Sequence, residues 1–319
     1  MNRRRLLAAA AAWPLARRAG AQQTNLPRLG VFVQGAPDPT LFLKELNDGL
    51  RDLGYVDGQT IQIELVSAGG KSDLLPSLAA ELVRRKVDVI VAWQTPVIAA
   101  IAQATREIPI VMGASADPVG SGFIQSLAKP GGNITGVAQP TAALSAKSVE
   151  FIRELLPRTQ HIAMLANPVD PFHKAFLEHV TLAGRTFGLA MQPVNIRDPG
   201  QLESAFVQMA SEKVDAVVVQ PSLPIERAAD LALQHRVPAA CSSRHFVVAG
   251  GLLGYVANPQ EQFRKVATYV GRLLKGARPA DLPVQEPTTF ELLLNTRTAR
   301  ALGLAIPASI LSRADELIE

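Results

Sequence analysis

Lys86-Val87-Asp88-Val89-Ile90-Val91-Ala92 and Lys213-Val214-Asp215-Ala216-Val217-Val218-Val219 are two similar stretches of this chain, and they decide how it folds. Short runs of β-branched residues such as these are typical of buried strands in a parallel sheet. Their first residues lie 127 positions apart, at 86 and 213. Similarity at a fixed distance indicates an internal repeat.

Neighbouring segments show the same repeat. After each copy comes a helical stretch and then a strand that begins at a proline, Pro109 or Pro238. The earlier strand at Arg28 has its counterpart at His161. Three strands at nearly one offset predict two lobes wound alike, although chance similarity between generic buried strands would also give such matches.

Strand-like runs alternate with amphipathic helical stretches along the chain, which is typical of parallel sheets covered by helices. With 319 residues, 48% of them apolar, the chain can bury more than one core. We therefore predict an α/β protein made of two doubly wound parallel-sheet lobes. The predicted strands are 29–34, 60–66, 87–92, 108–113, 134–138, 162–166, 191–196, 214–220, 238–242 and 252–256.

Residues 1–21 have the order of a secretory signal: arginines at 3–5, an apolar run over 6–16, and Ala19-Gly20-Ala21. We expect cleavage after about Ala21 and export to the periplasm, by either the general secretory or the twin-arginine route. The alternative is a membrane anchor, but this apolar run is too short to cross ~30 Å of hydrocarbon.

Removal of this leader changes the charge of the protein. The full chain carries +4, with 32 basic and 28 acidic residues, and five arginines lie in the leader. The mature chain would then hold 27 basic residues and a formal charge of −1. This balance, with 5% aromatic residues, argues against a nucleic-acid partner. Cys241 is the single cysteine, so no internal disulfide can form.

In open α/β sheets, ligands bind beyond the carboxyl ends of the strands. Trp93-Gln94-Thr95-Pro96 follows one predicted strand there and leads into a helix. Thr95 and Pro96 fit an N-cap and a first helical residue, and the free N–H groups behind them would suit a carboxylate. Ordinary capping of the helix explains the same residues.

Other polar residues follow the remaining strands. Asp117, before Pro118, could pair with a ligand ammonium or could cap a helix that Pro118 begins. In the second lobe the equivalent segments are mostly uncharged, and the lone Arg244 fits a surface position as well as a site. These segments are Asn167-Pro168, Gln220-Pro221-Ser222 and Ser242-Ser243-Arg244.

Catalytic and metal-binding motifs are missing from the sequence. It has no G-x-S-x-G and no H-E-x-x-H, and its five histidines lack ligand spacing. Gly69-Gly70-Lys71-Ser72 resembles part of a phosphate loop, but Val66 occupies the position of the first glycine. We therefore expect neither enzymatic activity nor a metal or other cofactor.

Several segments match, in order, one known family pattern between Arg28 and the C-terminus: 54–58, 78–83, 108–111, 117–120, 126–136, 250–252, 274–284, 290–292 and 313–316. With these segments the chain resembles the ABC-transporter substrate-binding protein family that includes tryptophan- and tyrosine-binding members. One departure is Gly254-Tyr255-Val256, where the family reads Ser-Tyr-Gly.

The resemblance implies a type I periplasmic-binding fold, with a hinge between the lobes and the ligand in the cleft. It places lobe 1 at 27–138 plus 256–284 and lobe 2 at 139–255 plus 285–319. It also places binding residues near Gln34, Thr95 and Asp117 in lobe 1 and near Gln220, Ser243 and Tyr255 in lobe 2. Trp93 or Tyr255 would pack on an apolar part of the ligand.

The favoured function is therefore the periplasmic solute-binding component of an ABC importer, which captures a small polar or aromatic carboxylate of amino-acid type. Its partners would be an ABC permease and an ATPase, with membrane contact only through the transporter, and we expect a monomer. Two alternatives stay open: a ligand-sensing module for a membrane receptor, and an exported α/β hydrolase, for which no activated nucleophile is visible.

Overall fold

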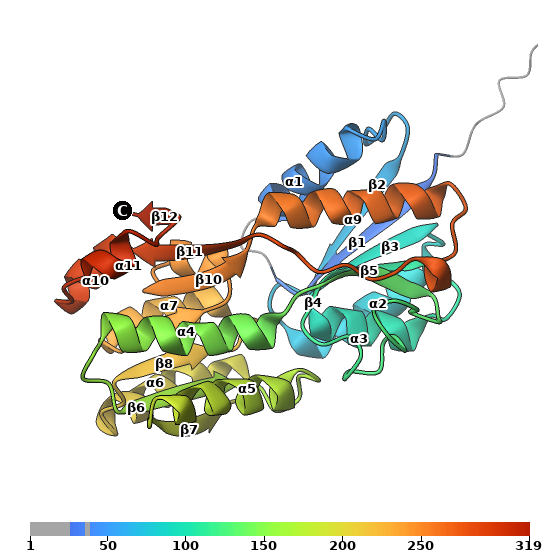
Figure 1. The fold of residues 1–319 in the computed structure, drawn as a ribbon. Coiled ribbons are helices and arrows are strands. Elements are labelled where there is room, and N and C mark those ends of the chain that lie inside the picture. Colours follow the sequence, from blue (N-terminus) through green and yellow to red (C-terminus); the bar gives the residue numbers. More distant parts are fainter. Residues whose placement is uncertain (1–25, 36–38) are drawn as a thin grey trace, which may run out of the picture.

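Two separate sheets organise the chain in the computed structural model, which describes residues 26–35 and 39–319 (Figure 1). The predicted leader lies outside these residues. The first sheet is parallel throughout and has the order β2-β1-β3-β4-β5. Its strands are β1 (Arg28–Val33), β2 (Gln62–Ser67), β3 (Val89–Trp93), β4 (Ile110–Ser115) and β5 (Ile134–Ala138).

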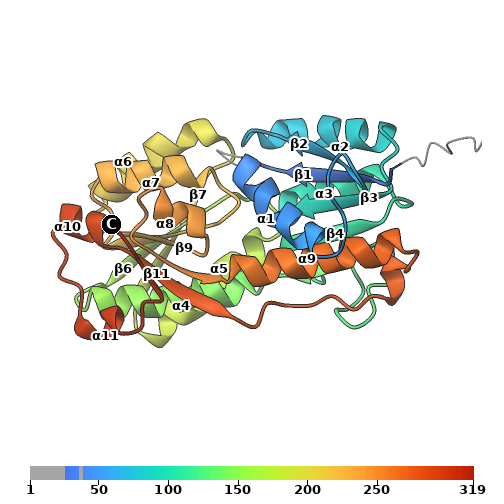
Figure 2. The same cartoon turned by 90° about the horizontal axis from the view of Figure 1, so that it is seen from above.

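The second sheet repeats this winding and extends it, with the order β12-β11-β10-β9-β8-β6-β7. Its segment β7-β6-β8-β9-β10 corresponds strand for strand to the first sheet, which confirms the predicted fold class of two α/β lobes (Figure 2). The strands are β6 (His161–Ala166), β7 (Ala190–Asn195), β8 (Ala216–Val219), β9 (Ala239–Cys241), β10 (Leu253–Ala257), β11 (Phe290–Asn295) and β12 (Glu316–Ile318).

The repeated Lys-Val-Asp sequence makes the same corner in both lobes. Lys86 and Lys213 each adopt a left-handed φ of 55°, which ends the preceding helix. The Asp88 carboxylate accepts a hydrogen bond from Arg28 N at 2.7 Å, and the Asp215 carboxylate accepts one from His161 N at 2.9 Å. Each aspartate thus ties the start of its own strand, β3 or β8, to the start of the neighbouring strand, β1 or β6.

All ten predicted strands are present, within two residues at either end, but two strands were not predicted. β11 runs antiparallel to β10, and β12 adds three residues at the sheet edge. Both lie beyond the repeated unit, so the repeat gave no signal for them.

Helices cover both faces of each sheet. α1 (Pro39–Arg51) and α9 (Pro259–Leu274) share a core with one face of the first sheet, and α2 (Leu75–Arg84) and α3 (Thr95–Ala104) cover the other. In the second lobe, α4 (Thr141–Leu155) and α5 (His173–Thr186) lie opposite α6 (Leu202–Ser211), α7 (Ile225–Gln234) and α8 (Arg244–Val248). The short helices α10 (Thr296–Leu302) and α11 (Ala308–Leu311) follow β11.

The chain passes between the lobes three times, because α9 packs on the first sheet although the strands on either side of it, β10 and β11, belong to the second (Figure 1). The connecting segments are hydrogen-bonded to one another: Ala138 N donates to Gln285 O, and Asn258 N donates to Thr289 O, both at 2.9 Å. The expected crossing at residue 256 falls inside β10, so Val256 and Ala257 belong to the second sheet.

Within the described ranges 26–35 and 39–319, no helix is both long and apolar enough to cross a membrane.

Gly136 offers a test of the first sheet. It has a φ of +127°, and a Cβ there would lie 2.4 Å from Met112 O on β4. We expect Gly136→Ala to lower the free energy of unfolding by about 2–4 kcal/mol, because it combines backbone strain with overpacking. Circular dichroism during thermal or urea unfolding would measure this loss.

Gly132→Ala is the matched control, since a Cβ at Gly132 meets nothing within 4 Å. Equal stability of the two variants would contradict the described register of β4 and β5.

Candidate functional site: the interlobe cavity

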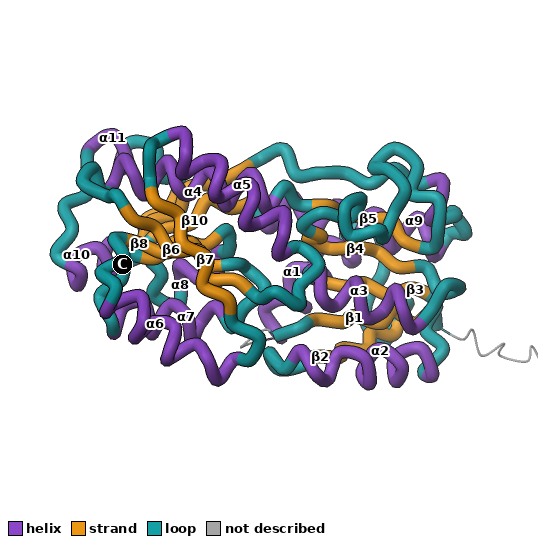
Figure 3. The backbone as a smooth tube through the Cα atoms, turned by 90° about the horizontal axis from the view of Figure 1, so that it is seen from below, coloured by secondary structure: helices purple, strands orange, loops and turns teal. Residues whose placement is uncertain are grey.

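A cavity of about 520 Å³ lies between the carboxyl ends of the two sheets. Lobe 1 contributes the ends of β1, β3 and β4, and lobe 2 contributes the loops after β6, β8 and β9. Loops from both sheets lie between the two lobes in Figure 3. This is the position at which open α/β sheets bind ligands, and the size suits a small molecule.

Three predicted residues of lobe 1, Gln34, Trp93 and Thr95, line this cavity. Two further residues of its wall, Gln94 and Ala114, have left-handed φ values of 76° and 65°. Such strain in residues other than glycine tends to cluster where a structure must present backbone groups to a ligand. Gln94 directly follows β3, and Ala114 lies near the end of β4, where its register with β5 shifts. Both positions are at the cavity, which supports a functional role for this edge of the sheet.

Trp93 is seated by its neighbours. Its ring stacks on Phe263 of α9, with 4.8 Å between ring centroids and 12° between planes. Gly113 of β4 leaves room for the indole, since a Cβ there would lie 2.1 Å from the ring. Trp93 and Phe263 both line the cavity and form an aromatic wall for an apolar ligand group.

Thr95 is the first residue of α3, and the N-cap is Gln94 rather than Thr95 as predicted. The Thr95 hydroxyl accepts a hydrogen bond from Ala116 N at 3.1 Å and so holds the loop after β4. No side chain caps α3, and this helix therefore begins at the cavity with N–H groups of its first turn available.

The predicted residues of lobe 2 separate into two groups. Ser243 lines the cavity, whereas Gln220 is fully buried behind it and Tyr255 lies on the other side of β10. Tyr255 packs against the rings of Phe151 and Phe290, at centroid distances of 5.4 and 5.9 Å. Because successive strand residues point to opposite faces, the next residue on β10, Val256, lines the cavity instead.

Asp117 does not reach the cavity. Its carboxylate accepts a hydrogen bond from Gly120 N at 2.9 Å, so it caps a turn at Pro118. Residues 118–122 form this turn rather than the predicted helix, and the structure shows the capping role of Asp117.

Asp170, in the loop after β6, is an acidic residue of the cavity that sequence reasoning missed. Its carboxylate accepts hydrogen bonds from Phe172 N (2.8 Å), Gln220 Nε2 (2.7 Å) and Ser222 Oγ. Burial raises the pKa of Asp170, and these hydrogen bonds act in the opposite direction. Gln220 therefore serves the site indirectly, by holding Asp170. The sequence contained one sign of this position: the Asn167-Pro168 segment after the predicted strand, which begins three residues before Asp170.

The two lobes touch across the cavity through amide side chains. Gln34 Nε2 donates to Ser222 O at 3.2 Å, and Gln94 Nε2 donates to Pro221 O at 3.4 Å. The described conformation is thus one in which lobe 1 and lobe 2 meet over the cavity. No group of three potential metal-binding His, Cys, Asp or Glu side chains occurs in the part of the chain that the structure describes.

The family model for ABC transporter substrate binding proteins matches residues 32–318. The chain belongs to this family. The predicted family is thereby confirmed, and so is the expectation of a binding protein rather than an enzyme.

Relatives of this substrate-binding protein agree with the match. It is 27% identical over 261 residues to the tyrosine-binding protein of Clostridioides difficile, covering 80% of this chain and 74% of that protein. A conserved domain protein from Vibrio cholerae is similar in structure, with a TM-score of 0.84, 27% identity, and coverage of 91% and 99% of the two chains. A Streptococcus pneumoniae ABC domain in complex with L-Trp has a TM-score of 0.83 at 28% identity, covering 92% and 100%.

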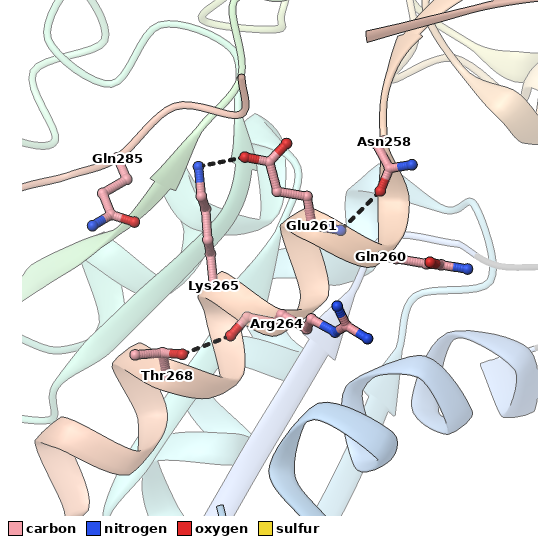
Figure 4. A pocket seen from close by; sticks show the side chains of 7 residues that line it. All are labelled: Asn258, Gln260, Glu261, Arg264, Lys265, Thr268 and Gln285. Carbon is pink, nitrogen blue, oxygen red and sulfur yellow. Dashed lines mark hydrogen bonds and ion pairs between the residues drawn. The ribbon is translucent and has the colours of Figure 1, made fainter. Parts of the chain in front are cut away.

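A second, more open pocket of this substrate-binding protein lies on the outer side of α9, beside the third connection between the lobes (Figure 4). Two of its polar side chains, Lys265 and Glu261, are already tied to one another. Lys265 Nζ pairs with Glu261 Oε1 at 2.8 Å and donates to Glu286 O at 2.7 Å. Glu261 also accepts hydrogen bonds from the backbone N–H groups of Thr288 and Thr289. These contacts form a clamp that fastens residues 286–289 to α9.

Glu261 makes the clamp sensitive to acid. The hydrogen bond from Lys265 is the largest influence on its pKa, which falls from 4.5 to about 2. A depressed pKa contributes stability that is present above pH 4.5 and is lost as the pH falls toward 2.

We expect Glu261→Gln to lower the midpoint of thermal unfolding at neutral pH by about 2–4 °C, which corresponds to about 1 kcal/mol. Between pH 4.5 and 2, the variant should lose less stability than the wild type, because the titrating carboxylate is gone. Calorimetry across this pH range measures both effects.

Glu178→Gln is the matched control: Glu178 also pairs with a lysine four residues away, at 3.8 Å from Lys174, but at an exposed position on α5. If both variants had the same pH profile, the clamp at Glu261 would have no special role.

Proposed function

We propose that this protein is the periplasmic component of an ABC importer and captures a small amino-acid-like carboxylate, polar or aromatic, between its lobes. The observation that carries the proposal is the cavity itself, which draws its walls from both lobes and is bridged by Gln34 and Gln94. The names of two relatives, a tyrosine-binding protein and a complex with L-Trp, support an amino acid as the ligand.

Each wall of the cavity suits one part of such a ligand. The first-turn N–H groups of α3, at Thr95, suit the carboxylate, since they are partial positive charges without a side-chain cap. Trp93 and Phe263 suit an aromatic or aliphatic side chain. Ser243, from lobe 2, adds a hydroxyl at the opposite wall.

A ligand held by both walls stabilises the conformation in which the lobes meet, because it binds that conformation more tightly than the open one. A permease and its ATPase would then recognise the closed form. In this proposal residues 1–21 are removed on export, the mature protein acts as a monomer, and the lobes divide near the three connecting segments.

A thermal-shift screen of purified residues 22–319 against amino acids, aromatic acids and dicarboxylates tests the proposal. A ligand that binds only the folded protein raises its melting temperature, by an amount that grows with ligand concentration. We expect at least one amino acid to do so, with binding then confirmed by calorimetry. Stabilisation by none of these classes would refute the proposed function.

Trp93 gives a more local test, because Trp13 lies in the leader and Trp93 is then the one tryptophan left in the mature chain. We expect its fluorescence to change on titration with a ligand found in the screen. Trp93→Ala removes this fluorophore, so its affinity is measured by calorimetry. We expect the substitution to weaken binding at least tenfold, about 1.4 kcal/mol, because the packing of the indole on the ligand is lost.

Phe187→Ala is the control for this substitution, since Phe187 is an aromatic residue 42% exposed and outside the cavity. Equal loss of affinity in both variants, or none in Trp93→Ala, would exclude Trp93 from the site.

A further inference from the structure

Asp170 is a buried carboxylate that makes no ion pair with any cationic side chain of residues 26–35 and 39–319. It is 5% exposed, and its three hydrogen bonds come from neutral groups. Burial is the largest influence on its pKa and raises it, and the nearby His173 comes last among the named causes. Isolating a carboxylate from water is costly unless an opposite charge compensates. Because Asp170 lines the cavity, a ligand can supply that charge.

Gln34 presents an unused acceptor to the same region. Its Nε2 donates to Ser72 Oγ at 3.0 Å and to Ser222 O at 3.2 Å. A carbonyl oxygen only accepts, so the amide nitrogen must face Ser222, and this fixes the orientation of the side chain. Gln34 Oε1 is then buried in the cavity wall with no hydrogen-bond partner. A buried acceptor of this kind is normally satisfied, here by a donor that the protein does not contain.

The two groups meet at one residue of lobe 2, Ser222. Ser222 Oγ donates to Asp170 Oδ2, and Ser222 O accepts from Gln34. Asp170 belongs to lobe 2 and Gln34 to lobe 1, so a single ligand group placed beside Ser222 can contact both lobes.

The remaining charges of the cavity favour a cation as well. Glu45 and Glu226 also line it, against Arg244 and His245. Arg244 is already paired with Glu316, at 2.6 Å. His245 and Arg244 act on Glu45, so Asp170 is left as the more isolated acid of the two. The described lining holds three carboxylates against one arginine.

We infer that Asp170 and Gln34 form an ammonium subsite at Ser222, in which the protonated amine of the ligand is held by a carboxylate of lobe 2 and an amide oxygen of lobe 1. The inference rests on the proposed function and narrows its ligand class to molecules with a free amine. Plain carboxylic acids, dicarboxylates and N-acylated amino acids would bind poorly. The amine, rather than the carboxylate alone, then couples binding to lobe closure.

Pairs of ligands that differ only in the amine test the subsite. The probes are L-tyrosine with phloretate and L-tryptophan with indolepropionate, titrated into purified residues 22–319 by calorimetry. For a pair whose amino acid binds, we expect its des-amino analogue to bind the wild type at least tenfold more weakly. Asp170→Asn should lower the affinity for the amino acid at least tenfold and leave the affinity for the des-amino analogue within about twofold of the wild-type value.

Gln34→Met is a second variant, of similar size but without the acceptor, which covers the case that Asp170→Asn fails to fold. It should also reduce the preference for the amine. Asp117→Asn is the matched control, an acid at the same sheet edge but outside the cavity, and it should keep the wild-type preference.

The possible failures are distinct. An analogue that binds the wild type as tightly as its amino acid, or a preference that survives in both Asp170→Asn and Gln34→Met, would overturn the subsite while the proposed function stands. If neither these probes nor any class in the thermal-shift screen binds, the proposed function falls, and the subsite falls with it.

Discussion

The direction of the strands is the constraint on which the rest of this structure depends. Both lobes contain five parallel strands wound in the same order, and a parallel sheet gathers all its carboxyl ends at one edge. In each lobe a Lys-Val-Asp corner fixes the opposite edge, through a left-handed lysine and an aspartate that accepts a hydrogen bond from the first residue of the adjacent strand, β1 or β6. With the two carboxyl edges facing each other, the cavity is enclosed by loops that carry polar groups and free helix N–H groups.

The contacts between the lobes explain how such a protein can respond to a ligand. Across the cavity, Gln34 and Gln94 each donate to a backbone carbonyl of lobe 2. A neutral hydrogen bond of this kind contributes about 0.5–1.5 kcal/mol net. Contacts of this size are smaller than those that a bound ligand can add, so in the proposed function a ligand would decide between an open and a closed form. The clamp at Glu261, by contrast, holds one connecting segment to α9 by an ion pair and several hydrogen bonds.

Much of the fold could be predicted from the sequence, because buried β-branched strands and their repeat are local signals. β11 and β12 could not, since one is an antiparallel addition outside the repeat and the other has three residues. The residues of the interlobe cavity were harder to predict than the fold. Gln34, Trp93, Thr95 and Ser243 lie on the cavity wall because each is the last residue of a strand or lies within two residues of its end.

Asp117, Gln220 and Tyr255 do not line the cavity, and the reasons are geometric. A turn uses the Asp117 carboxylate, burial places Gln220 behind Asp170, and strand alternation turns Tyr255 away. Asp170 was not predicted because it lies four residues beyond the end of β6, and it reaches the cavity only through the fold of that loop. Small-angle X-ray scattering of purified residues 22–319, with and without a saturating amino acid that raises the melting temperature, tests the central claim of two lobes closing on a ligand. The account predicts a smaller radius of gyration in the bound state, whereas identical scattering profiles with the ligand bound would contradict it.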